Sequence, residues 1–261
     1  MTVYRSTDHG KTWQPQETVV HPDRNGNVPS MHMAEHGITL RHGEQKGRLL
    51  RPARWYVGED NFANFSQHYN TAIYSDDGGA TWHTSDPFPA MGTGEGAVAE
   101  LSDGRIYYNS RRHWDPDGLK LMRWEAWSDD GSETWTNLTV STVLPDAPGC
   151  HGGLVRRAVR GRDVLLYSNC DSPSGRKDMA VWASFDGGKT WPIKRRVFDG
   201  PCAYSSLNAG RPGTSSEGWL YLLFEGGQSH KYEGGYLARF NLSWLLEGEK
   251  TGDGELSTWI R

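Results

Sequence analysis

The chain has 261 residues and a formal net charge of −4, and its composition includes 12 Trp, 11 Tyr and 32 Gly. This length is enough to bury a sizeable core, and the weak negative charge argues against a general attraction to nucleic acid or to an anionic membrane. The sequence also predicts no signal peptide and no membrane span, and it leaves the cellular compartment open.

Short strands separated by Gly, Pro, Asp and Asn are the predicted elements. In chain order we expect them over 47–57, 70–75, 96–101, 104–110, 122–128, 164–169, 179–185, 218–224 and 235–242. Loops are expected over 141–153 and 171–177, and one short helical turn over 243–247. Long apolar patterns of helical period are missing and no linker divides the chain, so we predict a single all-β domain over 1–261.

Variants of one octet, Ser-x-Asp-x-Gly-x-Thr-Trp, occur four times in the chain. They begin at residues 6, 75, 128 and 184, so successive starts are 69, 53 and 56 residues apart. In each octet the Asp side chain is expected to accept hydrogen bonds from turn N–H groups, and the Gly tolerates a positive φ. The Thr and Trp then begin the returning strand. We therefore predict a hairpin tip at each copy, carried by Asp8, Asp77, Asp130 and Asp186.

The spacing of the octets favours one fold over another. It suits one four-stranded unit per copy, and many evenly spaced strands with one aromatic-bearing turn per unit indicate a β-propeller. A β-sandwich is the alternative, but it does not require a repeated turn octet.

The cysteines and histidines indicate neither a disulfide framework nor a metal site. Cys150, Cys170 and Cys202 are odd in number and show no C-x-x-C spacing, so buried free thiols are predicted. The ten His residues show no H-x-x-x-H spacing. We expect no metal and no organic cofactor.

The octets and several further segments resemble the exo-sialidases, whose octets are known as Asp-boxes or BNR repeats. Residues 94–104 followed by 108–111 are similar to the family's stretch with a catalytic Glu and its second Arg, here Glu95 and Arg111. Residues 172–176 are similar to the segment of the third Arg, here Arg176, and residues 202–207 to the nucleophile segment, with Tyr204. Residues 223–225 resemble the late strand whose Glu, here Glu225, orients the first Arg. The resemblance implies a six-bladed propeller.

The implied chemistry requires these residue types. Sialic acid carries a carboxylate on its anomeric carbon, and Arg111 and Arg176 would bind it through paired N–H donors. A carboxylate nucleophile would meet a like charge there, whereas sialidases use Tyr. Tyr204 would need Glu95 as its base, because a free phenol is only about 0.1% ionised at pH 7. Taken singly, each residue also has an ordinary structural interpretation, but their joint order favours the functional one.

The beginning of the chain departs from the family pattern. The family's first Arg and its acid/base Asp precede the first Asp-box, and here only five residues do. We therefore expect a propeller that lacks part of its first blade, with roughly five whole blades and a fragment. Glu35 is the candidate replacement acid, and Arg54 and Tyr56 match a strand that lines the family's glycan pocket. A homo-oligomer that covers the exposed propeller edge is a further expectation.

Two functions from different classes follow. The first is a retaining exo-glycosidase that releases terminal sialic acid or a related nonulosonic acid. The second is a sialoglycan-binding propeller with little turnover, because the first Arg and the acid/base Asp are absent. In both cases the expected partner is a sialylated glycan or another acidic sugar, and not nucleic acid.

Overall fold

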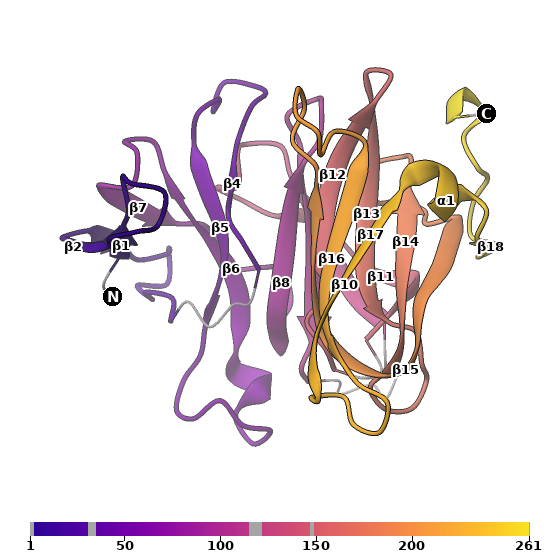
Figure 1. Ribbon diagram of the computed structural model, residues 1–261. Helices are drawn as coiled ribbons and strands as arrows, with labels where there is room; N and C mark the ends of the chain where they lie inside the picture. The colour runs from indigo at the N-terminus through magenta and orange to yellow at the C-terminus, as the bar shows by residue number, and fades with distance from the viewer. Residues whose placement is uncertain (1–2, 31–34, 115–121, 147–148, 261) are drawn as a thin grey trace.

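The computed structural model describes residues 3–30, 35–114, 122–146 and 149–260, and strands dominate it (Figure 1). Helical segments in these ranges are short, namely α1 (Leu242–Leu246) and the 3-10 turns η1 (Phe65–Gln67) and η2 (Thr258–Ile260). No helix of the described ranges is long and apolar enough to cross a membrane. The predicted all-β class is confirmed.

The first half of the chain forms a hairpin and two sheets. The hairpin pairs β1 (Val3–Arg5) with β2 (Gln14–Gln16). The next sheet has the order β3-β7-β6-β5-β4, from β3 (Val19–His21), β4 (Ile38–Thr39), β5 (Leu49–Trp55), β6 (Tyr69–Ser75) and β7 (Thr81–Thr84). A four-stranded meander follows, built from β8 (Thr93–Glu100), β9 (Ile106–Arg112), β10 (Met122–Ser128) and β11 (Thr136–Pro145).

The second half forms one continuous antiparallel arrangement that one long strand holds together. Its strands are β12 (Gly153–Val159), β13 (Arg162–Cys170), β14 (Lys177–Ser184), β15 (Ile193–Ala209), β16 (Trp219–Gly226), β17 (Gly234–Asn241) and β18 (Glu249–Lys250). The first part of β15 pairs with β14 and its last part pairs with β16. The seven strands therefore make two sheet units that share β15.

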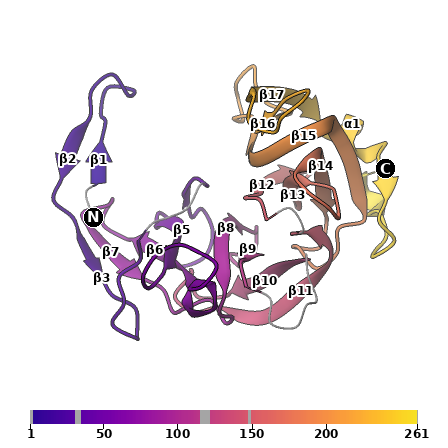
Figure 2. The same cartoon turned by 90° about the horizontal axis from the view of Figure 1, so that it is seen from below.

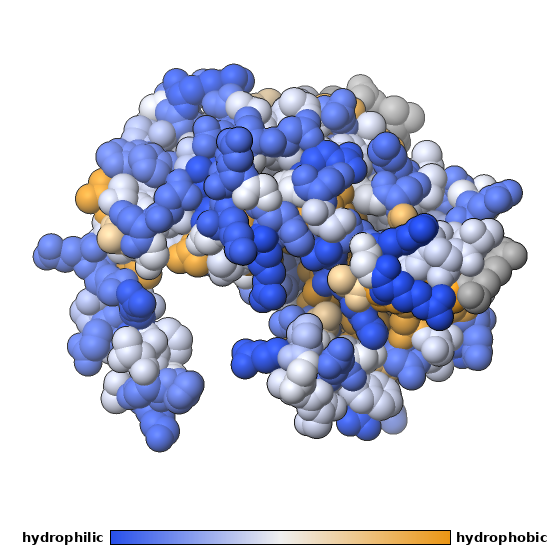
Figure 3. Space-filling view, turned by 90° about the horizontal axis from the view of Figure 1, so that it is seen from above, coloured by the Kyte–Doolittle hydropathy of each residue, from blue (hydrophilic) through white to orange (hydrophobic). Residues whose placement is uncertain are grey.

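The sheet units follow one another along an arc. Figure 2 shows the β1–β2 hairpin at one end of the arc and β16 and β17 at the other, with the arc open between them. The space-filling view shows the same open outline, and most of the visible surface is hydrophilic (Figure 3). The described residues thus form four sheet units and one hairpin, fewer than the five whole blades expected. The six-bladed propeller with an incomplete first blade remains a prediction.

The core lies between successive sheet units. One apolar cluster, with Leu50, Val98 and Trp135, joins the β3–β7 sheet to the β8–β11 sheet. Two further clusters continue along the arc, the first between the meander and β12–β15 and the second between β12–β15 and β15–β17. Each unit buries its faces against its neighbours, as in radially packed sheets.

The octets form hairpin tips as predicted. They join β1 to β2, β6 to β7, β10 to β11 and β14 to β15. In each, the Asp carboxylate accepts the Thr backbone N–H at 2.9–3.0 Å, and the Ser hydroxyl donates to the same carboxylate. The third octet has Ser132 at the Gly position, and Ser132 still adopts a φ of 80°. The turn geometry is therefore retained even where glycine is replaced.

Several strands lie outside the predicted ranges, and the longest of them are β11, β12 and β15. The expected loop over 141–153 is in part β11, an outer strand whose mostly exposed polar residues give no burial pattern, and residues 147–148 lie outside the described residues. β12 was not predicted. β15 was missed because Asp199, Gly200 and Pro201 suggest a turn, yet the strand continues through them with irregular pairing to β14.

Candidate active site

A β-bulge in β8 positions Glu95. Between Thr93 and Gly96 this strand takes three steps while its partner β9 takes two, from Arg112 to Ser110. The extra residue bends the strand and re-aims the side chains beside it. Glu95 consequently lies against Arg111 of β9, and Arg111 Nη1 donates to Glu95 Oε2 at 2.6 Å.

A second bulge positions Tyr204 on β15. Between Cys202 and Ser205 this strand takes three steps, while β16 takes two, from Gly226 to Phe224. The bulge leaves the Tyr204 backbone N–H outside the ladder, and Glu225 Oε2 accepts it at 3.2 Å. Among the described residues, Glu225 thus holds the backbone of Tyr204 rather than an arginine. This is a different role from the one that the resemblance implies.

The two bulges bring four of the predicted residues together. The Tyr204 hydroxyl donates to Glu95 Oε1, while Arg111 Nη1 lies 3.5 Å from the same hydroxyl oxygen. The guanidinium carbon of Arg176 lies 5.4 Å from the centre of the Tyr204 ring. Arg176 is held by the Gly149 carbonyl, to which Nη2 donates at 2.7 Å, and by the Tyr232 hydroxyl. A phenol, a carboxylate and two guanidiniums therefore converge from β8, β9, β15 and the loop before β14.

The electrostatics of this cluster keep Glu95 ionised and Tyr204 protonated. Burial alone would raise the pKa of Glu95, but the hydrogen bond from His113 and the charge of Arg111 hold that pKa well below its usual value. For Tyr204, burial and then the neighbouring Glu95 carboxylate raise the pKa of the phenol, while the two arginines oppose that rise. The phenolic proton thus belongs to Tyr204 in the resting site, and Glu95 is the acceptor beside it.

His113 is part of the cluster, although sequence reasoning did not select it. Its Nε2 lies 3.1 Å from Glu95 Oε2, and burial lowers the pKa of His113 to about 4. The imidazole is therefore neutral near pH 7, with its proton on the nitrogen that faces the carboxylate. Gly94 makes room for it, since a Cβ at that position would lie 2.4 Å from the ring. The feature of the sequence that could have indicated His113 is its position two residues after Arg111.

Arg123 is a second residue that sequence reasoning missed, and it supports the site from beneath. Its side chain is fully buried and donates to Asp146 Oδ1 at 3.0 Å and to Asn109 Oδ1 at 2.8 Å. The same guanidinium donates to the carbonyl oxygen of Glu95 at 3.2 Å and to that of Cys150 at 3.1 Å. Arg123 therefore ties the strand that carries Glu95 to the segment that carries the Arg176-binding carbonyl.

Arg54 and Tyr56 lie beside the cluster rather than in it. Arg54 is buried and donates to both Asp60 oxygens, at 2.6 and 3.1 Å, and its Nη2 lies 2.5 Å from His68 Nδ1. The Tyr56 ring packs on His68, with ring centres 5.4 Å apart. Phe65 lies between this group and the site, because its ring makes an edge-to-face contact with His68 and stacks on His113.

Glu35 does not have the environment of an acid. It is buried, it pairs with His36, and its Oε2 lies 3.3 Å from His151 Nε2. The Ser206 hydroxyl donates to its other oxygen at 3.1 Å. Burial raises the pKa of Glu35, but the hydrogen bonds from His151 and His36 outweigh it and lower that pKa to about 2. These partners hold the carboxyl in its ionised form near neutral pH, which does not favour Glu35 as the acid, and its role as the replacement acid stays a prediction.

The cysteines behave as predicted. Cys150, Cys170 and Cys202 are free and buried, and they gather behind the site, with the Cys170 and Cys202 sulfurs 3.3 Å apart. Within the part of the chain that the structure describes, no group of three or more His, Cys, Asp or Glu side chains could hold a metal ion.

Comparison with known proteins identifies the family of the chain. Residues 1–215 match the BNR repeat-like domain family. A sialidase of Micromonospora viridifaciens is 32% identical over 252 residues, which is 93% of this chain and 35% of that protein. The chain belongs to the BNR-repeat sialidase family.

Other members of the sialidase family match over a similar extent. Human Sialidase-3 is 29% identical over 245 residues, covering 76% of this chain and 54% of that protein. The solved structure of the Hadza microbial sialidase Hz136 superposes with a TM-score of 0.71 at 26% identity, over 94% of this chain and 44% of that one. The chain therefore spans between about a third and about half of these sialidases.

Proposed function

We propose that this protein is a retaining exo-sialidase-like glycoside hydrolase with a sialidase-type propeller fold. Its substrate is a glycan with a terminal α-linked sialic acid or related nonulosonic acid. The observation that carries the proposal is the hydrogen bond between the Tyr204 hydroxyl and Glu95, placed between Arg111 and Arg176. An anionic sugar needs this combination, because the cations hold its carboxylate and a neutral phenol can approach the carbon beside it.

Substrate recognition and base activation are coupled through Arg111. In the resting site Arg111 pairs with Glu95 at 2.6 Å. When the substrate carboxylate takes donors of Arg111, Glu95 loses part of the positive charge that keeps its pKa low. Its pKa then rises toward the usual range, and the carboxylate becomes a stronger base for the phenol. Substrate binding thus makes Glu95 a stronger base for the nucleophile Tyr204.

The reaction then follows two displacements at the anomeric carbon. The Tyr204 oxygen forms a bond to that carbon as the bond to the glycosidic oxygen breaks, and the phenolic proton passes to Glu95. The leaving oxygen takes a proton from solvent. Water next attacks the same carbon, the bond to Tyr204 breaks, and Glu95 returns its proton to the phenolate while the proton of the water passes to solvent. Two inversions give retention.

A fluorogenic sialoside assay tests the proposal. We expect turnover by the wild type and a loss of at least about a hundredfold in kcat/KM for Tyr204→Phe. The matched control is Tyr236→Phe, which removes a hydroxyl from a surface ring that packs on Phe224. Proton NMR should show the α-anomer as the first product. Equal background rates for the wild type and Tyr204→Phe, with retained glycan binding, would instead indicate a glycan-binding propeller.

A further inference from the structure

A cavity lies at the far end of the strands that carry the candidate active site. Its volume is about 540 Å³, and its walls come from β4, β8, β12 and the segment after β15. On β8, Glu95 belongs to the active site and Glu100 to this cavity. Glu100 comes five positions after Glu95, which is about 16 Å at the rise of a strand. None of the residues proposed for catalysis lines this cavity.

The cavity is basic although the whole chain is acidic. Its lining includes four arginines, Arg41, Arg156, Arg157 and Arg211, and two carboxylates, Glu100 and Glu217. Four positive and two negative charges leave +2, against −4 for the chain. A concave surface of one sign concentrates counter-ions of the other sign.

The carboxylates of the lining are already engaged. Glu100 accepts the backbone N–H of Arg41 at 2.7 Å and that of His42 at 2.8 Å. Glu217 accepts the backbone N–H of Gly213 at 2.8 Å. Both carboxylates therefore hold backbone N–H groups, and among the described residues neither forms an ion pair with an arginine of the cavity.

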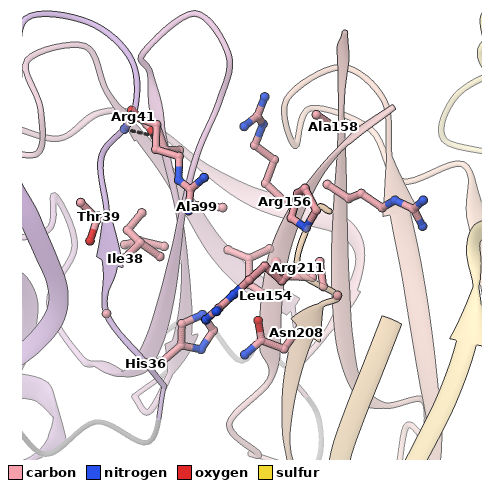
Figure 4. Close-up of a pocket in the computed structure, with 18 of the residues that line it drawn as sticks. His36, Ile38, Thr39, Arg41, Ala99, Leu154, Arg156, Ala158, Asn208 and Arg211 are labelled. Atoms are coloured by element: carbon pink, nitrogen blue, oxygen red, sulfur yellow. Dashed lines mark hydrogen bonds between the residues drawn. The ribbon is translucent and has the colours of Figure 1, made fainter. Parts of the chain in front are cut away.

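Two of the four arginine side chains have hydrogen-bond or ion-pair partners among the described residues, and two do not. Arg156 pairs with Asp163, and Arg157 Nη1 donates to the Gly218 carbonyl at 2.7 Å. For the guanidiniums of Arg41 and Arg211, the described part of the chain supplies no hydrogen-bond or ion-pair partner. Figure 4 shows Arg41 on one wall of the cavity and Arg211 extending from the opposite wall toward His36.

His36 lies at the base of the cavity, where it pairs with Glu35. The hydrogen bond with Glu35 raises the pKa of the imidazole above its ordinary value. Arg211 extends toward this pair (Figure 4). An anion between the walls would satisfy the donors of Arg41 and Arg211.

We propose that this cavity binds a small organic oxyanion, a sugar-sized molecule that carries a phosphate or sulfate group. The volume lies in the range of small-molecule sites and exceeds the needs of a bare inorganic ion. Arg41 and Arg211 hold the anionic group from opposite walls. Ile38, Leu154 and Pro212 give the body of the ligand an apolar surface, and Asn208 offers it a polar contact.

Calorimetric titration of the whole chain with glucose 6-phosphate and with N-acetylglucosamine 6-sulfate tests this site, and it needs no enzymatic activity. We expect saturable one-site binding of at least one of them, and none of neutral glucose. Arg41→Ala combined with Arg211→Ala should weaken binding at least about tenfold, the least expected for a lost charged contact. Both side chains are exposed, so the fold should be unaffected, which circular dichroism verifies.

Three matched arms complete the test. Arg5→Ala with Arg196→Ala removes the same charge elsewhere and should leave binding unchanged. Arg176→Ala, which alters the candidate active site, should also bind like the wild type. The proposal is overturned if neither sugar ester binds, if the Arg41/Arg211 variant binds as well as the wild type, or if Arg176→Ala abolishes binding. Inorganic phosphate binding as tightly as the sugar esters would overturn the assignment of an organic ligand.

Discussion

Removing the His113 imidazole should move the acid limb of the pH–rate profile to higher pH. The neutral ring donates to Glu95 Oε2 at 3.1 Å and so favours the ionised carboxylate. Without that donor the ionised form is less stable and the pKa of Glu95 rises. The base must be ionised to accept the proton of Tyr204, so activity would begin to fall at a higher pH than in the wild type.

The size of the shift follows from the hydrogen bond that is lost. A hydrogen bond to a charged group contributes about 1.5–3 kcal/mol, and about 1.4 kcal/mol corresponds to one pKa unit. Arg111 remains at 2.6 Å from the same oxygen and compensates in part. We therefore expect His113→Phe to raise the acid limb of kcat/KM by roughly one pH unit. His113→Gln keeps an N–H donor and should shift it less.

The assay is kcat/KM for a fluorogenic sialoside between about pH 3 and pH 8. His83→Phe is the matched control, because His83 is exposed on β7, where it stacks on His21, far from the cluster in sequence and in the sheet order. An acid limb that stays in place in His113→Phe, with kcat/KM reduced equally at every pH, would refute the reasoning. His113 would then be a packing residue that does not influence the ionisation of Glu95.

Three further outcomes are expected. Arg123→Met removes the ion-pair partner of the buried Asp146, so urea unfolding should show a free energy of unfolding lower by about 3–5 kcal/mol. The control Arg24→Met breaks an exposed surface pair and should change the free energy of unfolding by less than about 0.5 kcal/mol. Because Glu35 has its pKa lowered to about 2, its contribution to stability is present above its unfolded value near pH 4.5 and is lost as the pH falls toward 2; Glu35→Gln should flatten the pH dependence of unfolding there. Light scattering should detect an oligomer that covers the β17 edge and that Leu237→Glu dissociates, since Leu237 is 68% exposed, and a wild type that is monomeric at all concentrations would contradict this.

The local turns and the identity of the main site residues were predictable from the chain itself. An Asp followed by a Gly and then Thr-Trp forms a hairpin tip through contacts within a few residues, so all four tips could be placed without tertiary information. Glu95, Arg111, Arg176 and Tyr204 were selected because the segments around them, in this order along the chain, resemble those of the exo-sialidases, and their types suit an acidic sugar. The contacts of a hairpin tip lie within one octet, and each site residue lies in a short segment of its own, so both can be found in the sequence without knowledge of the fold.

The geometry of the site depended on the tertiary structure. The two bulges arise from the register between neighbouring strands, which no single segment determines, and they bring Glu95 and Tyr204 together across 109 residues of sequence. The ionisation of Glu35 likewise could not be predicted from the sequence. It depends on a contact between the buried Glu35 carboxylate and His151, which is 116 residues away along the chain. Burial and long-range partners set a pKa, and both exist only once the sheets have packed against one another.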